Sequence, residues 1–316
     1  MNDASAASSA IRRSRVRLGS GVRRVALGST LAAARGALRR GFARVRPRRS
    51  RPELSVIICS VDDRRFAQCD ANWRDRLQGR RYELIRIRDA RSLAEGYNRG
   101  LARSRGERLV FCHDDIELLQ PDVYERIVAH LRCADVAGVA GSSRLLSGLW
   151  SGSGQPDTHG QVVSPAPNGD GFHLDVFGFA SQAAGKAIQA LDGLFLAVRR
   201  NVAEALRFDA ESFDGFHLYD ADFTFRAYLA GFHLAVCHDI LIYHASLGDY
   251  DEAWKRYAEV FRRKYADRLS TAPAGDEVRL RFWMRDKSEA LALFEQVARQ
   301  QGPIEADAAT PPAASA

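Results

Sequence analysis

Short apolar runs alternate with amphipathic stretches between residues 54 and 141, and this pattern predicts strands that alternate with helices. The apolar runs have the length of buried strands and lie at 54–60, 82–87, 109–112 and 136–141. The helical stretches lie at 66–77, 93–104 and 121–133. Strands and helices in this order indicate an α/β fold, with a parallel sheet and right-handed crossovers.

The regular alternation ends after residue 141. Residues 142–185 are rich in Gly, Ser and Pro, which predicts a long, weakly structured segment that contributes to a substrate pocket or a lid. Further strands are expected at 190–199, 232–236 and 239–244, and further helices at 220–230, 250–268 and 277–300. The chain thus divides into an N-terminal arm, a main domain, a C-terminal helix and a disordered tail, at residues 1–53, 54–270, 276–301 and 302–316.

Positive charge is concentrated at the N-terminus. The net charge of the chain is +7, but residues 1–53 hold 14 Arg and two acidic residues, a net charge of +12. Residues 54–316 therefore carry a net charge of −5. Because binding to a phosphate backbone needs a basic surface on the folded domain, this distribution excludes a nucleic-acid-binding function for that domain.

Residues 20–50 combine apolar positions at helical spacing with many Arg residues. One interpretation is a basic amphipathic helix on an anionic membrane surface, and the alternatives are a disordered arm or an organellar transit peptide. No apolar run approaches the about 18 residues of a membrane span, and no signal-peptide core is present. The five Cys form no CxxC pair, which favours reduced thiols. We therefore expect a cytoplasmic protein, peripheral to the inner face of the membrane.

Acidic and imidazole side chains occur where the predicted strands end or helices begin. Ligands of open α/β sheets bind at the carboxyl ends of the strands, so these side chains are expected to meet in one crevice. They are Asp89, His113, Asp114, Asp115, Asp220, Asp222, Arg226 and His244. Each also has a simpler interpretation, as a turn residue, a helix cap or a strand-end histidine bonded to the backbone.

Three of these residues form a coherent set for transfer from a sugar nucleotide. A divalent cation, Mg²⁺ or Mn²⁺, held by Asp115 and His244 would neutralise the diphosphate as it leaves. Asp220 starts a helix, where the helix dipole keeps a carboxylate ionised, and it is the expected general base for an acceptor hydroxyl.

The other candidates are expected to have supporting roles. Asp114 would accept a hydrogen bond from a ribose hydroxyl, and Asp89 would contact the base or the ribose. Arg226 follows Asp222 by four residues, so the two side chains can pair and hold the start of their helix rigid. His113 lies two residues before the predicted metal ligand and would support the site.

Five segments of the chain resemble, in order, the family-2-type inverting glycosyltransferases of the GT-A fold. They are LSVIICS (54–60), SLAEGYNRGLARSRGERLVFCHDDI (92–116), ALDGLFLAVRR (190–200), FDGFHLYDADFTFRAYLAGF (213–232) and VCHDILIYHASLGDYDEAW (236–254). In detail they look closest to the subgroup related to the StrF domain of streptomycin biosynthesis. The resemblance implies a mixed, mostly parallel sheet flanked by helices, a nucleotide-sugar donor, Mn²⁺ or Mg²⁺, and single displacement with inversion.

The resemblance also implies roles for individual residues. It implies that Asp115 binds the metal, that Asp220 is the base for the acceptor, and that His244 contacts the metal or the diphosphate. The donor nucleotide would be contacted by Cys59, Ser60, Asp89, Asn98 and Asp114. Two positions depart from the family pattern, because the usual Asp-x-Asp triplet begins with His113 and the usual Glu before the base is Tyr219.

The sequence therefore predicts a metal-dependent inverting glycosyltransferase of the hexosyltransferase type. Its expected acceptor is a sugar, a lipid-linked molecule or another hydroxyl compound, in bacterial glycan or glycoconjugate synthesis. A nucleotidyltransferase is one alternative, but it needs a Gly-rich basic loop after the first strand, where this chain has SVDDRR at 60–65. The other alternative is a non-catalytic scaffold that binds a glycan or a membrane-bound complex, favoured by the Arg-rich arm and the altered first acid.

Overall fold

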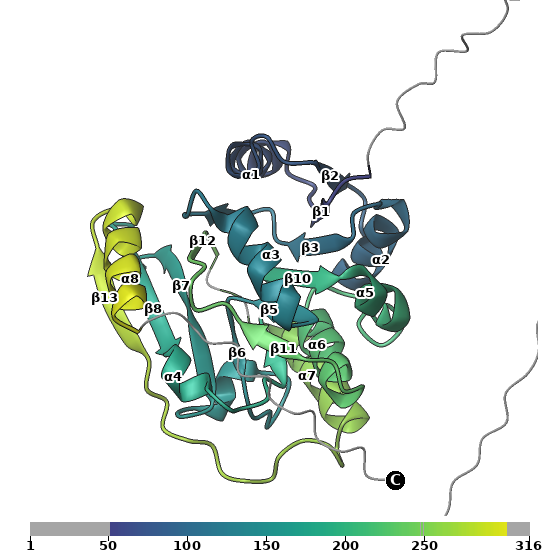
Figure 1. Cartoon of the computed structure of the whole chain (residues 1–316). Helices are drawn as coiled ribbons and strands as arrows, with labels where there is room; N and C mark the ends of the chain where they lie inside the picture. The colour runs from purple at the N-terminus through teal and green to yellow at the C-terminus, as the bar shows by residue number, and fades with distance from the viewer. Residues whose placement is uncertain (1–50, 247, 249, 302–316) are drawn as a thin grey trace, which may run out of the picture. The chain divides into compact units, whose positions relative to one another are not determined.

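The structure is a computed structural model, and it describes residues 51–246, 248 and 250–301. The predicted amphipathic helix at 20–50 and the predicted tail at 302–316 lie outside the described residues. Among the described helices, none is long and apolar enough to cross a membrane. The described residues form two sheets with helices packed against them (Figure 1).

The first sheet contains the strand-and-helix alternation expected from the sequence. Its six strands, in spatial order, are β11 (Leu234–Val236), β5 (Val136–Gly138), β10 (Phe195–Arg199), β3 (Arg108–Cys112), β1 (Leu54–Cys59) and β2 (Tyr82–Ile87). β1 is parallel to β2 and β3, and β5 is parallel to β11, whereas β10 is antiparallel to both of its neighbours. The predicted mixed, mostly parallel sheet is confirmed.

Helices cover both faces of this sheet, which is why its central strands are apolar throughout. The helices are α1 (Asp63–Arg76), α2 (Leu93–Arg103), α3 (Val123–Cys133), α5 (Arg200–Leu206), α6 (Tyr219–Leu229) and α7 (Glu252–Lys264). Successive side chains of a strand point to opposite faces. Ile57 of β1 accordingly lies in the core with α2, α5, α6 and α7, while Val56 and Ile58 lie in the core with α1 and α3.

The second sheet is larger than the sequence indicated. Its seven strands are β13 (Leu280–Met284), β8 (Phe172–Gly178), β7 (Thr158–Pro165), β12 (Ile242–His244) and β4 (Ile116–Leu118), with β6 (Ala140–Ser142) paired to β7 and β9 (Ala190–Leu191) paired to β6. Two predicted strands, 136–141 and 190–199, are each divided between the two sheets, as β5 with β6 and as β9 with β10. The chain therefore passes from one sheet to the other at two neighbouring points.

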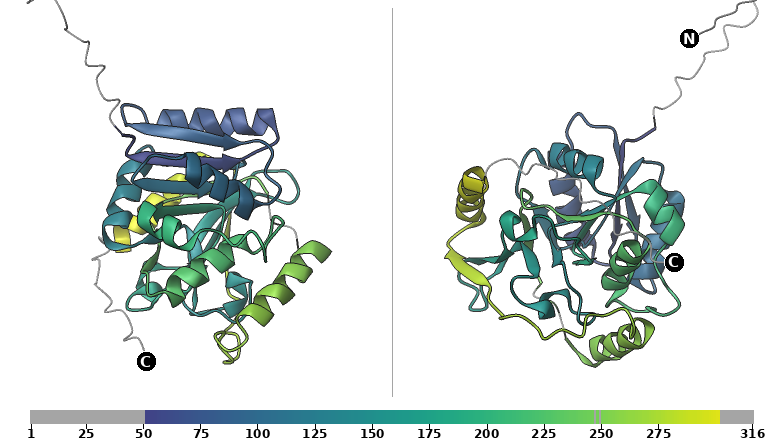
Figure 2. Two further views of the ribbon diagram at one scale, coloured as in Figure 1. Left: turned by 90° about the vertical axis from the view of Figure 1, so that its right-hand side faces the viewer. Right: turned by 60° about the horizontal axis from the view of Figure 1, so that its bottom comes forward.

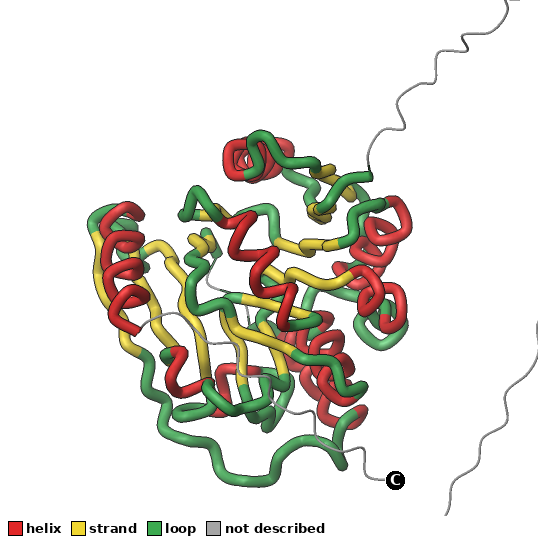
Figure 3. Tube along the Cα trace, viewed as in Figure 1, coloured by secondary structure: helices red, strands yellow, loops and turns green. Residues whose placement is uncertain are grey.

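The prediction of a weakly structured segment at 142–185 is wrong. This segment contains η1 (Trp150–Ser153), β7, β8 and α4 (Ala180–Ala183), as Figure 3 shows. One face of β7 and β8 lines a cavity and carries polar side chains such as Ser164 and Asp175. The usual apolar alternation of a strand is therefore weak in this part of the sequence.

The prediction of a single C-terminal helix at 277–300 is also wrong. Leu280–Met284 forms β13, and α8 (Lys287–Gln301) begins only after Asp286, whose carboxylate accepts hydrogen bonds from the backbone N–H groups of residues 288 and 289. α8 packs Ala290 and Phe294 against the second sheet. β13 and α8, drawn in yellow, lie together beside β8 (Figures 1 and 2).

Candidate active site

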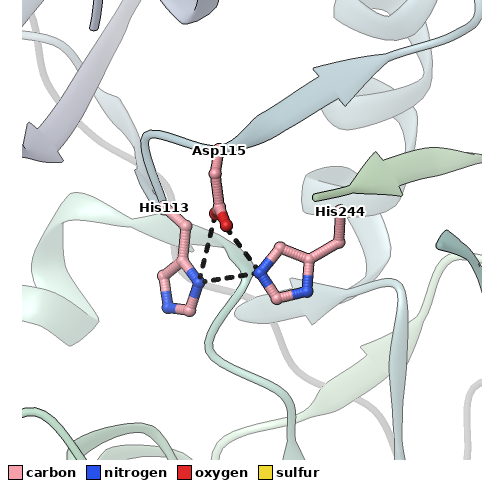
Figure 4. A group of neighbouring side chains, drawn as sticks. All are labelled: His113, Asp115 and His244. Carbon is pink, nitrogen blue, oxygen red and sulfur yellow. Dashed lines mark hydrogen bonds and ion pairs between the residues drawn. The ribbon is translucent and has the colours of Figure 1, made fainter. Parts of the chain in front are cut away.

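Three side chains converge beyond the carboxyl end of β3. His113 follows β3, Asp115 precedes β4, and His244 ends β12, which pairs with β4 so that His244 lies opposite Ile116. His244 Nε2 lies 3.3 Å from Asp115 Oδ1, and His113 Nδ1 lies 3.9 Å from the same oxygen. The two imidazole nitrogens are 3.3 Å apart (Figure 4). We call these three residues the metal group.

The metal group has the donor atoms and the spacing that a divalent cation requires. One ligand atom from each side chain lies within 4.8 Å of the other two. Two imidazoles and one carboxylate suit Mn²⁺ and other transition ions better than Mg²⁺, which prefers oxygen ligands. Asp115 and His244 are the predicted ligands, and His113, predicted only as a supporting residue, lies close enough to be the third.

Burial and neighbouring charges determine the protonation of the metal group. Burial opposes ionisation of Asp115, but the hydrogen bond and charge of His244 outweigh it and hold the pKa of this carboxyl below its ordinary value. Burial and the charge of His244 lower the pKa of His113, which favours a neutral imidazole. For His244, burial is outweighed by the hydrogen bond to Asp115, which raises its pKa. An ionised carboxylate and a neutral His113 are the forms that bind a cation.

The two positions that depart from the family pattern, His113 and Tyr219, contact each other. The Tyr219 hydroxyl lies 2.8 Å from His113 Nε2, and it donates to the Gly193 carbonyl at 3.3 Å. In the tautomer that a metal-binding Nδ1 requires, His113 Nε2–H donates to the Tyr219 oxygen, and the Tyr219 hydroxyl donates to Gly193. The Nδ1 lone pair of His113 then faces the other two members of the metal group, as in a metal-bound imidazole.

Asp220, the predicted base, lies in the first turn of α6 and is held by the backbone around it. Leu218, just before the helix, has a left-handed backbone with a φ of 61°. The Asp220 carboxylate accepts a hydrogen bond of 2.7 Å from the Gly193 N–H. A Cβ at residue 193 would collide with the Tyr219 hydroxyl and with the Asp220 side chain, so only glycine fits here.

A second carboxylate, Asp192, lies beside Asp220. Burial of Asp220 is the larger effect and the charge of Asp192 the smaller, and together they raise the pKa of Asp220 to about 7. Asp192 accepts hydrogen bonds from the Trp150 indole at 2.8 Å and from the Leu194 N–H at 2.9 Å. A carboxyl with a pKa near neutrality is suited to take up a proton during a reaction.

His113, His244, Asp192 and Asp220 share one cavity of about 280 Å³, between the start of α6 and one face of the second sheet, whereas Asp115 does not line it. Its lining includes His113, His244, Asp192, Asp220, Trp150 and Tyr250. Aromatic rings around a few converging polar groups are typical of a site for a small polar ligand. The sequence predicts no role for Asp192 or Trp150, because Asp192 lies inside the single strand expected at 190–199 and Trp150 has no evident partner.

Five residues predicted to contact a nucleotide do not line this cavity, namely Cys59, Ser60, Asp89, Asn98 and Asp114. The Asp89 side chain is 79% exposed and pairs with Arg99 at 3.0 Å. The Asn98 amide bonds both main-chain polar atoms of Phe208 and so secures a loop. Burial raises the pKa of Cys59 to about 12, and its thiol therefore stays protonated. The nucleotide contacts of all five stay predictions.

The predicted pair of Asp222 and Arg226 is present, with Arg226 Nε 2.8 Å from Asp222 Oδ2. Asp222 is fully buried, and it also accepts hydrogen bonds of 2.6 Å from Lys264 Nζ and from the Tyr265 hydroxyl. The carboxylate thus connects α6 to the end of α7, and it does not line the cavity.

Replacing Asp222 with Ala is expected to lower the free energy of unfolding by about 3 kcal/mol, because two cations and a hydroxyl lose their buried acceptor. Unfolding in urea, followed by circular dichroism, measures this change. Glu259→Ala is a matched control, since Glu259 pairs with Arg262 and Arg263 on the surface, where ion pairs contribute little. Equal destabilisation by the two substitutions would contradict the role given to Asp222.

A comparison with known protein families gives a match over most of the chain. A model described as "Glycosyltransferase like family" matches residues 55–265. A curated relative from Fuscovulum blasticum, the ATP synthase subunits region ORF 6, is 30% identical over 176 residues. That match covers 52% of this chain and 62% of the relative, so the chain spans less than two thirds of the relative's length.

Two solved structures are similar at low sequence identity. The mannosyltransferase PcManGT from Pyrobaculum calidifontis, in complex with GDP-Man and Mn²⁺, is 14% identical with a TM-score of 0.43, over 71% of this chain and 66% of its own. GalNAc-T7, with UDP, GalNAc and Mn²⁺, is 13% identical with a TM-score of 0.42, over 69% of this chain and 49% of its own.

Proposed function

Because the chain belongs to the glycosyltransferase-like family and has a mixed α/β fold, we propose that it is a metal-dependent inverting glycosyltransferase of the GT-A type. It transfers a sugar from a nucleotide-diphosphate donor to a hydroxyl acceptor. The observation that carries the proposal is the cavity shared by His113, His244 and Asp220. A cation site beside a carboxylate with a pKa near neutrality supplies the two functions that such a transfer needs.

The metal group is proposed to form the donor end of the site. When a cation is bound there, it supplies charge neutralisation for the departing diphosphate. Asp115 provides the negative charge that attracts the cation, and the two imidazoles complete the donor set. Tyr219 holds the His113 ring so that its Nδ1 faces the other ligands.

Asp220 is the proposed general base. It takes the proton from the acceptor hydroxyl, whose oxygen forms a bond to the anomeric carbon while the bond from that carbon to the diphosphate breaks. A single displacement of this kind inverts the configuration at the carbon. The Gly193 N–H orients the carboxylate, and the charge of Asp192 increases its affinity for the proton.

Two further parts of the proposal are supported by sequence patterns. The donor nucleoside is proposed to contact Cys59, Ser60, Asp89, Asn98 and Asp114. Residues 54–270 are proposed as the catalytic domain, acting in bacterial glycan or glycoconjugate synthesis in the cytoplasm, with residues 20–50 on the inner face of the membrane.

The nucleotidyltransferase alternative finds little support at the first strand–helix junction. A triphosphate cradle needs free backbone N–H groups at this point. Here the Asp62 carboxylate accepts hydrogen bonds from the N–H groups of Arg64 and Arg65, at 2.8 and 3.0 Å. A carboxylate thus occupies the place that a phosphate would need.

Donor hydrolysis across a panel of UDP-, GDP- and other nucleotide sugars, with Mn²⁺ or with EDTA, tests the proposed function. We expect one donor to be hydrolysed only with Mn²⁺, with the sugar released in inverted configuration as read by NMR. The matching nucleotide diphosphate with Mn²⁺ should raise the melting temperature, because a ligand that binds only the folded state stabilises it. Folded protein that hydrolyses no donor and binds no nucleotide would favour the scaffold alternative.

A further inference from the structure

The last strand of the second sheet, β13, and the residue just before it contribute two arginines to the cavity, Arg281 and Arg279. β13 lies outside the family match at 55–265, and it pairs antiparallel with β8, where Arg281 lies opposite Asp175. Arg279 and Arg281 both line the cavity that contains Asp220. Residues beyond the family match therefore build one wall of the candidate active site.

Strand register places these arginines on the same face of the sheet as His244. Along β12, β7, β8 and β13, the positions that face the cavity include His244, Ser164, Val162, Asp175 and Arg281. The alternate positions Val163 and Leu174 point to the opposite face, as strand geometry requires, and lie in the core with α8. One continuous surface thus connects the metal group to the arginines.

The wall of the cavity that contains Arg279 and Arg281 carries an excess of positive charge. Arg281 makes a two-point ion pair with Asp175, at 2.7 and 3.0 Å, and Arg279 lies 3.5 Å from the same carboxylate. The Asp175 side chain is 7% exposed, whereas those of Arg281 and Arg279 are 36% and 45% exposed. Two guanidinium groups therefore share one buried carboxylate, and the three groups together have a charge of +1.

A buried hydroxyl on the same surface points to a ligand. Ser164 is 5% exposed and lines the cavity, and its Oγ has no hydrogen-bond partner among the residues that the structure describes. Buried polar atoms are normally satisfied by protein, water or ligand. The position of Ser164, two strands from β13 and next to β12, places this hydroxyl between the arginines and the metal group.

We propose that Arg279, Arg281 and Ser164 form an acceptor subsite for an anionic group, either a carboxylate or a phosphate ester. Guanidinium groups bind both anions through charge-assisted hydrogen bonds. The inference rests on the proposed function, because it takes the metal group as the donor end. β13 lies three strand spacings from β12, about 14 Å, and a diphosphate held at the metal group covers only part of that span. This distance favours the acceptor over the donor as the source of the anion.

Titration calorimetry on the whole chain, loaded with Mn²⁺ and UDP or GDP, tests this subsite with glucuronate, glucose 6-phosphate and glucose. We expect both anionic sugars to bind about tenfold more tightly than glucose, the effect of one charge-assisted contact. Arg279→Gln should remove this preference and leave the affinity for nucleotide and Mn²⁺ unchanged. The variant keeps the two-point pair of Arg281 with Asp175, which holds β13 on β8. Arg285→Gln is the matched control, since Arg285 pairs with Glu289 and does not line the cavity.

Each outcome of the titration either supports or overturns the proposed subsite. Equal binding of neutral and anionic sugars would overturn it, and so would a preference that survives in Arg279→Gln. Weaker nucleotide binding in Arg279→Gln would put the arginines on the donor diphosphate and overturn the acceptor assignment. If the unaltered chain binds no nucleotide, the proposed function fails, and the same titration without nucleotide decides whether the anion subsite exists.

Discussion

Asp220→Asn is expected to reduce the rate of sugar transfer by about 10²- to 10⁴-fold, the usual contribution of a general base. Asn has the shape of Asp, so its side-chain oxygen still accepts the Gly193 N–H, but it cannot take up the proton. The measurement is the initial rate of Mn²⁺-dependent donor turnover. Stabilisation by nucleotide diphosphate and Mn²⁺ should persist, because the metal group does not include Asp220. Normal turnover in this variant would show that another group is the base.

The pH dependence of turnover tests the surroundings of the same residue. Burial and the charge of Asp192 raise the pKa of Asp220 to about 7, so below that pH the carboxyl is protonated and cannot act as a base. The value of kcat/KM should therefore rise as the pH increases through about 7 and become constant above it. Asp192→Asn removes one of the two causes and should move the rise to lower pH. An unchanged profile would mean that the rise reports a different group.

Asp115→Asn should have the second large effect, the loss of Mn²⁺ binding and of metal-dependent turnover. The substitution removes the carboxylate that supplies the negative charge of the metal group. The loss of affinity should exceed the about 10- to 100-fold that follows from removing a single outer hydrogen bond. Titration with Mn²⁺, followed by electron paramagnetic resonance, measures the affinity directly without any substrate. Unaltered Mn²⁺ affinity would remove the metal group from the proposed mechanism.

Tyr219→Phe is the matched comparison for that experiment. It keeps all three members of the metal group and removes only the hydroxyl that contacts His113 Nε2. The Mn²⁺ affinity should fall by about 10- to 100-fold, less than in Asp115→Asn, because the imidazole loses its orientation and not its lone pair. If Tyr219→Phe binds Mn²⁺ as tightly as the unaltered chain, His113 does not depend on this contact.

The central strands of the first sheet could be predicted from the sequence because they are buried on both faces. β1 and β3 are short apolar runs with amphipathic helices between them, and few other structures give that pattern. β7 and β8 could not be predicted in this way, since one face of each lines the cavity and the other packs on α8. Polar residues on the cavity face, such as Ser164 and Asp175, interrupt the apolar pattern and resemble the composition of a loop.

β13 was mistaken for the start of a helix for a different reason. Residues 277–300 contain enough apolar positions for an amphipathic helix, and α8 does form in their second half. Leu280 and Phe282 alternate with Arg281 at a period of two, but five residues are too few for that period to stand out. The strand forms because β8 offers it a partner, which local sequence does not reveal.

The sequence predicts Asp115 from the end of a strand and Asp220 from the start of a helix. In the structure Asp115 lies beside His113 and His244, and these two histidines line the same cavity as Asp220. The roles given to Asp115 and Asp220 stay predictions. The contact between His113 and Tyr219 could not be predicted, because 106 residues separate them and the contact depends on where the fold places the start of α6. Asp192 was missed because it marks the crossing between the two sheets, and the sequence pattern indicated a single strand there.

The pairing of β13 with β8 has a practical consequence for handling this protein. β13 hydrogen-bonds along one side of β8, and α8 covers apolar side chains that include Val163 and Leu174. A chain truncated at residue 265, where the family match stops, would keep the metal group and Asp220. It would also expose an unpaired sheet edge and an apolar surface to solvent, and both features promote aggregation. Recombinant versions should therefore extend at least to residue 301, where α8 ends.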